Sequence, residues 1–198
     1  MKNNPLEDTQ NKFFNLLAAA VKNREYKTID YEYDDIVTYQ DAKCLKLIFT
    51  DNNWYLACEI KDERLILLRV AFIKKLQYCP NKPSSYQTIA LKKYNSYFEN
   101  MQNAMTLADT ASQKAILQAN KHIARYFKKE MKPFFISQRF IGESPDGGII
   151  FSVNFTQSLE VLPFIKRWLP DLEIIEPRSL KEALKLDLQK ALSVIDSS

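Results

Sequence analysis

Over much of the first 80 residues, apolar and polar positions alternate in short runs, and turn residues separate one run from the next. Ahead of these runs, residues 8–22 carry apolar side chains at helical spacing. Asp51-Asn52-Asn53 and Lys61-Asp62-Glu63 have the composition of tight turns. The pattern therefore predicts an amphipathic helix and then five short strands. We expect these strands at residues 28–33, 43–50, 54–60, 64–70 and 72–78.

The rest of the chain changes period. Two prolines in 79–85 end the strand pattern, and apolar side chains then recur at helical spacing over 91–107. Beyond residue 112, short apolar runs alternate with amphipathic stretches in the order strand, helix, strand, strand, helix, strand, which is that of a ferredoxin-like βαββαβ sandwich. We expect these elements at 114–119, 121–131, 134–141, 148–155, 158–169 and 172–177, with a closing helix through Leu180, Leu184, Leu188 and Leu192.

The middle strand of the first region opens with Trp54-Tyr55-Leu56, between two tight turns and ahead of a strand that carries Arg69. This setting resembles the WYL domain, a small β-barrel related to the Sm fold that occurs mainly in bacterial transcription regulators. The C-terminal third resembles the extension that follows WYL domains, in which a strand ending in an acidic residue and proline, here Glu176-Pro177, opens a last helix.

Together these features predict an α+β protein in which a small Sm-like five-stranded β-barrel precedes a ferredoxin-like βαββαβ domain. Regulators of the resembled family usually begin with a winged helix-turn-helix, and about 25 residues are too few for such a domain. We expect this chain to be either a fragment of a regulator or a protein without that domain. The expected divisions are an N-terminal helix (1–25), the barrel (26–80), a linker with a helix (81–112) and the C-terminal domain (113–198).

The resemblance also implies a ligand site, because WYL domains are thought to sense nucleotide-type or single-stranded nucleic-acid ligands near the motif. By position, Tyr55 and Arg69 match the family's site residues, and Lys43 and Lys46 on the preceding strand would add positive charge. The family's Arg-Leu-Asp-Arg-Ile stretch is Arg69 to Ile73 here, with its Asp and second Arg replaced. The motif's first residue, Trp54, is expected to pack in the core, which directs Tyr55 to the opposite face.

Composition limits the other classes of protein. The chain is 46% hydrophobic and lacks an apolar run near the ~20 residues of a membrane helix, so we expect a globular, cytoplasmic protein without membrane contact. Three cysteines without paired spacing predict neither disulfides nor a metal site. A single histidine, His122, and three glycines provide no catalytic pair and no glycine-rich phosphate loop. We therefore expect no catalytic residue, no metal and no cofactor, and a protein that is not an enzyme.

Charge is unevenly distributed although the net charge is only +4. Residues 61–140 hold 15 Lys and Arg against 5 Asp and Glu, whereas both flanking regions are acidic. Two interpretations remain open for this middle region, a surface for phosphates or the solvated side of a helix that bears Lys121, Arg125 and Lys128.

These observations predict the ligand-sensing and oligomerisation module of a WYL-type bacterial transcription regulator. Its effector would be a nucleotide or single-stranded nucleic acid, and it would control DNA binding allosterically through a helix-turn-helix domain that this chain does not include. The alternative is a non-catalytic protein-interaction module that has lost ligand binding, and a third hypothesis is direct single-stranded nucleic-acid binding as the end function. We also expect a homodimer, since Phe13 and Phe14 cannot both face one small barrel comfortably.

Overall fold

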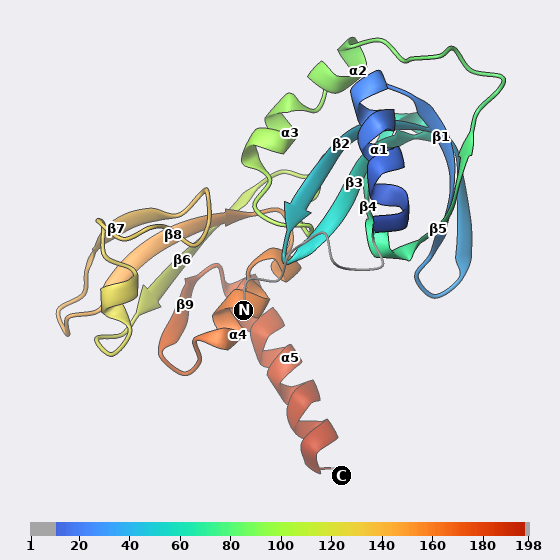
Figure 1. The fold of residues 1–198 in the computed structure, drawn as a ribbon. Coiled ribbons are helices and arrows are strands. Elements are labelled where there is room, and N and C mark those ends of the chain that lie inside the picture. The colour runs from blue at the N-terminus through green and yellow to red at the C-terminus, as the bar shows by residue number, and fades with distance from the viewer. Residues whose placement is uncertain (1–10, 197–198) are drawn as a thin grey trace. The chain divides into compact units, whose positions relative to one another are not determined.

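The chain forms two compact units. The computed structural model describes residues 11–196, and contacts divide the chain into one unit up to Glu99 and another from Asn100 onward (Figure 1). Within the described residues, the first unit contains one antiparallel sheet of five strands and the second unit one antiparallel sheet of four strands. The predicted combination of helices with two separate sheets is confirmed. Among residues 11–196, no helix is long and apolar enough to cross a membrane.

The sheet of the first unit has the strand order β4-β3-β2-β1-β5. All five strands predicted from the alternating pattern are present, although β2 begins earlier than expected. Short 3-10 turns, η1 (Lys61–Glu63) and η2 (Val70–Phe72), connect β3 to β4 and β4 to β5. Closure of this sheet into an Sm-like barrel stays a prediction. The strands are β1 (Tyr26–Glu32), β2 (Ile36–Thr50), β3 (Asn53–Ile60), β4 (Arg64–Arg69) and β5 (Ile73–Tyr78).

One face of this sheet packs against helix α1 (Asn11–Asn23). Leu17 and Ala20 of the helix are fully buried in a core with Leu56 and Cys58 of β3. The predicted helix at 8–22 is thus confirmed from residue 11, and its residues 8–10 lie outside the described part of the chain.

The segment after β5 packs on the other face of the sheet. Tyr86 and Tyr94 are buried there with Leu45, and the Tyr86 hydroxyl donates to the backbone oxygen of Cys44 (2.6 Å). This segment lies within the stretch 81–112 that the sequence suggests as a linker, and the division between the compact units falls after Glu99.

The single helix predicted at 91–107 is wrong. Two short helices, α2 (Ile89–Lys92) and α3 (Asn95–Asn100), take its place, and the chain is irregular beyond them. Polar side chains in the irregular part bind elsewhere in the second unit, as the Thr106 hydroxyl does with the carboxylate of Glu160 (2.8 Å). Glu160 is buried, so its hydrogen bonds stabilise this non-helical path.

The sheet of the second unit has the strand order β7-β8-β6-β9, and its core lies between the sheet and the helices. The predicted strands 114–119, 148–155 and 172–177 and the closing helix are present. The predicted helix 158–169 is a 3-10 turn, η4 (Ser158–Glu160), followed by a shorter α-helix. The main elements are β6 (Gln113–Ala119), β7 (Arg139–Glu143), β8 (Ile149–Phe155), α4 (Leu162–Arg167), β9 (Leu172–Glu176) and α5 (Arg178–Asp196).

The helix predicted at 121–131 is also wrong, and the ferredoxin-like order lacks its first helix. Turns and a 3-10 helix, η3 (Ala124–Tyr126), occupy this stretch. The Asn120 side chain accepts a hydrogen bond from the backbone N–H of His122 (3.0 Å) and donates to Asp171 (2.7 Å), which favours a turn. The strand expected at 134–141 likewise begins later, at the start of β7. The ferredoxin-like topology stays a prediction.

Candidate functional site

Tyr55 and Arg69, the two residues that match the family's site, lie directly opposite each other on β3 and β4. Opposed residues of an antiparallel pair project from the same face of the sheet, so the two side chains are neighbours. Burial raises the pKa of the Tyr55 hydroxyl, and the positive charge of Arg69 opposes that rise. The hydroxyl therefore stays protonated at neutral pH and can donate a hydrogen bond.

The guanidinium of Arg69 is held against an aromatic ring and retains an unused donor. Its Cζ lies 5.1 Å from the centre of the Phe72 ring. Its Nε is buried and has no hydrogen-bond partner among the described residues. A buried N–H without a partner costs about 1–3 kcal/mol, a cost that an acceptor from a ligand would remove. This end of the sheet therefore has a fixed positive charge with a free donor.

Aromatic rings from β1 and from the residue that follows it complete this corner of the first unit. The rings of Tyr31 and Tyr33 lie 6.0 and 5.6 Å from that of Phe72. The backbone N–H of Arg69 donates to the Tyr31 hydroxyl (3.3 Å), and burial raises the pKa of Tyr31. We name Tyr31, Tyr55, Arg69 and Phe72 the arginine corner. Sequence reasoning missed Tyr31, which the pairing of the strands brings to Arg69, and Phe72, which the 3-10 turn η2 places beside it.

Trp54 projects from the opposite face of β3, as the sequence predicts. Its ring is half-buried against the core that contains α1, with the rings of Phe14 and Phe49 at 4.8 and 5.2 Å. Phe13 also packs on that core, so both phenylalanines of α1 contact their own unit. The pair therefore provides no argument for a homodimer. The tryptophan ring of this chain is a packing residue.

Lys43 and Lys46 are engaged by other groups. The register pairs Lys43 with Glu59, to which its ammonium group is ion-paired, and pairs Lys46 with Ala57. The Lys46 ammonium lies 5.0 Å from the centre of the Phe98 ring. The structure thus brings Tyr55 and Arg69 together and gives each lysine a different neighbour.

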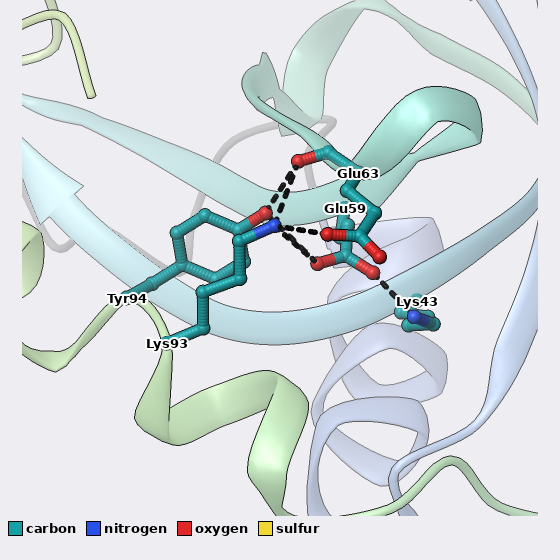
Figure 2. A network of polar contacts seen from close by, with 5 residues as sticks. All are labelled: Lys43, Glu59, Glu63, Lys93 and Tyr94. Carbon is teal, nitrogen blue, oxygen red and sulfur yellow. Dashed lines mark hydrogen bonds and ion pairs between the residues drawn. The ribbon is translucent and has the colours of Figure 1, made fainter. Parts of the chain in front are cut away.

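A polar network surrounds Glu59, a carboxylate that is only 4% exposed (Figure 2). Its Oε2 lies 2.8 Å from the Tyr94 hydroxyl and 3.8 Å from Nζ of Lys93, which also binds the Glu63 carboxylate (2.7 Å). The Tyr94 hydroxyl also lies 2.7 Å from the backbone oxygen of Glu63 and can donate to either acceptor. Lys43 binds the other oxygen of Glu59. These contacts fasten the α2–α3 segment to the sheet.

The pKa directions in this network agree with its hydrogen bonds. Burial raises the pKa of the Tyr94 hydroxyl to about 12, which keeps it a donor. The hydrogen bond from Lys93 lowers the pKa of the Glu63 carboxyl, and the same bond raises the pKa of Lys93. Sequence reasoning missed Glu59 and Tyr94. The available signal was a glutamate within an otherwise apolar strand, where a buried charge needs a partner.

A cleft of about 720 Å³ adjoins this network. Tyr26 and Tyr39 contribute aromatic surface to it, and Lys82 is ion-paired there with Asp41 (3.5 Å). Its walls combine acidic and basic side chains. The lining residues are Tyr26, Thr38, Tyr39, Gln40, Asp41, Lys43, Glu59, Ile60, Lys61, Asp62, Glu63 and Lys82.

Two solved structures are similar to the chain. Proteasome accessory factor B/C (PafBC) of Arthrobacter aurescens is 17% identical with a TM-score of 0.36, and the match covers 87% of this chain and 25% of that one. A CRISPR Cas-related protein is 10% identical with a TM-score of 0.52, over 95% of this chain and 51% of that one. The chain thus spans about a quarter and about half of these proteins, and the second likeness concerns the fold alone.

The family comparison concerns the second unit. No curated protein matches the sequence. The family model of the WCX domain matches residues 112–192, which run from the start of β6 into α5. This is the region whose resemblance to the extension of WYL domains follows from its strand, acidic-proline pair and closing helix. Residues 112–192 therefore match the WCX domain, the C-terminal domain associated with WYL domains, and the predicted resemblance of this region to that domain is confirmed.

Proposed function

We propose that this chain is the ligand-sensing and oligomerisation module of a WYL-type bacterial transcription regulator. The first unit would be the WYL barrel, with a nucleotide-type or single-stranded nucleic-acid effector bound at the arginine corner. Effector binding would change the state of the module and so control DNA binding by a helix-turn-helix domain. The WCX domain and the WYL-like strand pattern support the regulatory role, and the geometry of the corner supports the class of effector.

The observation that carries the proposal is the unused donor of Arg69 beside Tyr55. A guanidinium binds phosphate through parallel N–H donors, and Nε is one of them. The contact with Phe72 restrains the guanidinium before any ligand arrives, which reduces the entropy lost on binding. The half-buried ring of Tyr55 offers an adjacent surface for a base. The corner thus has separate groups for the two chemical parts of a nucleotide.

Binding of a fluorescein-labelled thymidine tetranucleotide at low ionic strength, followed by fluorescence anisotropy, tests the proposal. Arg69→Ala should weaken binding roughly 10- to 100-fold, because it removes charge-assisted hydrogen bonds. Arg69→Lys should restore charge without the paired donors and recover only part of the affinity. Arg64→Ala is the matched control, since Arg64 is an exposed arginine at the other end of β4.

Arg69→Ala and Arg64→Ala are expected to differ in their effect on oligonucleotide affinity. Loss with Arg69→Ala and wild-type affinity with Arg64→Ala would support the corner as the site. Equal effects of both substitutions would show a general charge effect and contradict the proposal. Absence of binding by the wild-type chain would remove the sensing role and leave the interaction module.

The alternative interaction module has one observation in its favour. The hairpin between β1 and β2 exposes apolar side chains, with Tyr33 72% and Ile36 64% exposed. Exposed apolar groups at a hairpin end are a common feature of protein-binding surfaces. On this alternative, Arg69→Ala would change no ligand affinity, and Ile36→Ser would weaken capture of a protein partner.

We also propose that the module is a homodimer. Because Phe13 and Phe14 pack within their own unit, the support comes from α5, whose last turns expose Leu188, Leu192 and Ile195.

A further inference from the structure

The second unit presents aromatic rings at its surface next to the 3-10 helix η3. Tyr126 is 37% exposed and Phe134 is 45% exposed. Both rings contact the half-buried ring of Trp168, at 5.4 and 5.8 Å between centres. Large apolar rings usually occupy the interior, so two exposed rings against a third form a surface feature that core packing does not require.

Aromatic residues of the unit's core hold the exposed rings in position. Phe127 is buried and stacks on Phe151, with ring centres 4.8 Å apart and an interplanar angle of 12°. Phe134 lies 5.4 Å from Phe127 and 5.1 Å from Phe164. An aromatic surface supported in this way loses little side-chain entropy when a planar group stacks on it.

Two arginines lie on these rings. Cζ of Arg125 is 4.9 Å from the centre of the Tyr126 ring, and its Nη2 donates to the Tyr126 hydroxyl (3.0 Å). Cζ of Arg167 is 5.9 Å from the ring of Trp168. Guanidinium planes extend a stacking surface and also bind phosphate. We name Arg125, Tyr126, Phe134, Arg167 and Trp168 the aromatic–basic patch.

The chain around the patch is strongly basic and is not neutralised. Residues 121–139 contain six Lys or Arg and one acidic residue, Glu130. Lys128, Lys129 and Lys132 are exposed, and within residues 11–196 they form no ion pair with a carboxylate. Since the predicted helix at 121–131 is absent, this charge is not the solvated side of a helix. It is carried by the turns between β6 and β7, which also bear the exposed rings.

We propose that the aromatic–basic patch binds single-stranded nucleic acid. Unstacked bases have free faces for rings and guanidinium planes, whereas duplex bases do not, and unpaired lysines supply charge for the phosphates. The patch lies in the second unit and shares no residue with the arginine corner, so it is a second contact surface beyond the proposed effector site. An acidic peptide or an anionic membrane would use the same charge without needing the stacked rings.

The experiment measures anisotropy of a fluorescein-labelled thymidine oligonucleotide of roughly 15 nucleotides with the full chain. Tyr126→Ala should weaken binding about tenfold by removing a stacking ring, and Tyr126→Phe should retain most of the affinity. Arg125→Ala and Arg167→Ala should each weaken binding and reduce the slope of log affinity against log salt by about 0.7. Because Tyr126, Arg125 and Arg167 are exposed, these variants should fold, and circular dichroism checks this.

Two comparisons separate this site from charge alone and from the arginine corner. Arg178→Ala removes an equal charge from an exposed arginine of the same unit and should bind like wild type. In an Arg69→Ala background the patch variants should still weaken binding, so the two proposals fail independently. Wild-type affinity with Tyr126→Ala, or an equal loss with Arg178→Ala, would overturn the patch. So would binding of anionic lipid vesicles by a chain that does not bind the oligonucleotide.

Discussion

At the scale of single residues, the two halves of the Trp54-Tyr55 pair have separate roles because they lie on opposite faces of β3. Trp54 packs on the core with Phe14 and Phe49, so Trp54→Ala should lower the free energy of unfolding by about 3 kcal/mol. Tyr55→Phe keeps the ring and should leave stability nearly unchanged. Urea unfolding followed by far-ultraviolet circular dichroism measures the free energy of unfolding of both variants without relying on tryptophan fluorescence. A larger loss of stability from Tyr55→Phe than from Trp54→Ala would contradict these roles.

The Glu59 network gives a second prediction about single residues. Tyr94→Phe removes the hydroxyl that donates to a buried carboxylate, and should cost about 1–3 kcal/mol of unfolding free energy. Tyr78→Phe is the control, because Tyr78 is 60% exposed and its change should have little effect. Equal stability of the two variants would show that the network does not fasten the α2–α3 segment.

Residue-level chemistry was only partly predictable from the sequence. Tyr55 and Arg69 were identified by position in a motif, and their pairing across β3 and β4 needed nothing beyond short turns. Glu59 was missed because its role depends on the residues that face it from other elements, and Phe72 because the shape of the turn η2 sets its contact with Arg69. Lys43 illustrates the same limit. Its charge suggests a ligand contact, whereas the strand register places it opposite Glu59, with which it forms an ion pair.

At the scale of elements, prediction succeeded where one local rule decides the structure. The strands of the first unit alternate in polarity between short turns, so period and turn chemistry agree. The predictions of helices at 91–107 and 121–131 are wrong, because apolar residues at helical spacing can also be buried by turns. In both stretches, hydrogen bonds to distant partners, Glu160 and Asp171, favour a non-helical path. Such partners cannot be identified from the local sequence.

At the scale of the whole molecule, α5 presents an apolar row that its own unit covers only in part. Leu180 and Leu184 are buried in the core of the second unit, whereas Leu188, Leu192 and Ile195 are 38%, 57% and 68% exposed. Residues four apart form a ridge along a helix, and ridges of this kind pack against those of a second helix. A second copy of the chain offers the same ridge, with the self-complementarity that a two-fold interface needs.

The resulting prediction is a homodimer that depends on this ridge. Light scattering should give twice the 23.1 kDa mass of the chain at micromolar concentration, and Leu188→Glu with Leu192→Glu should return it to the monomer mass. Two charges placed in an apolar interface would have to be desolvated, which opposes association. Leu186→Glu is the matched control, because Leu186 is 52% exposed but lies off the ridge, and it should leave the dimer intact. A monomer mass for wild type, or a dimer that persists in the double variant, would contradict self-association through α5.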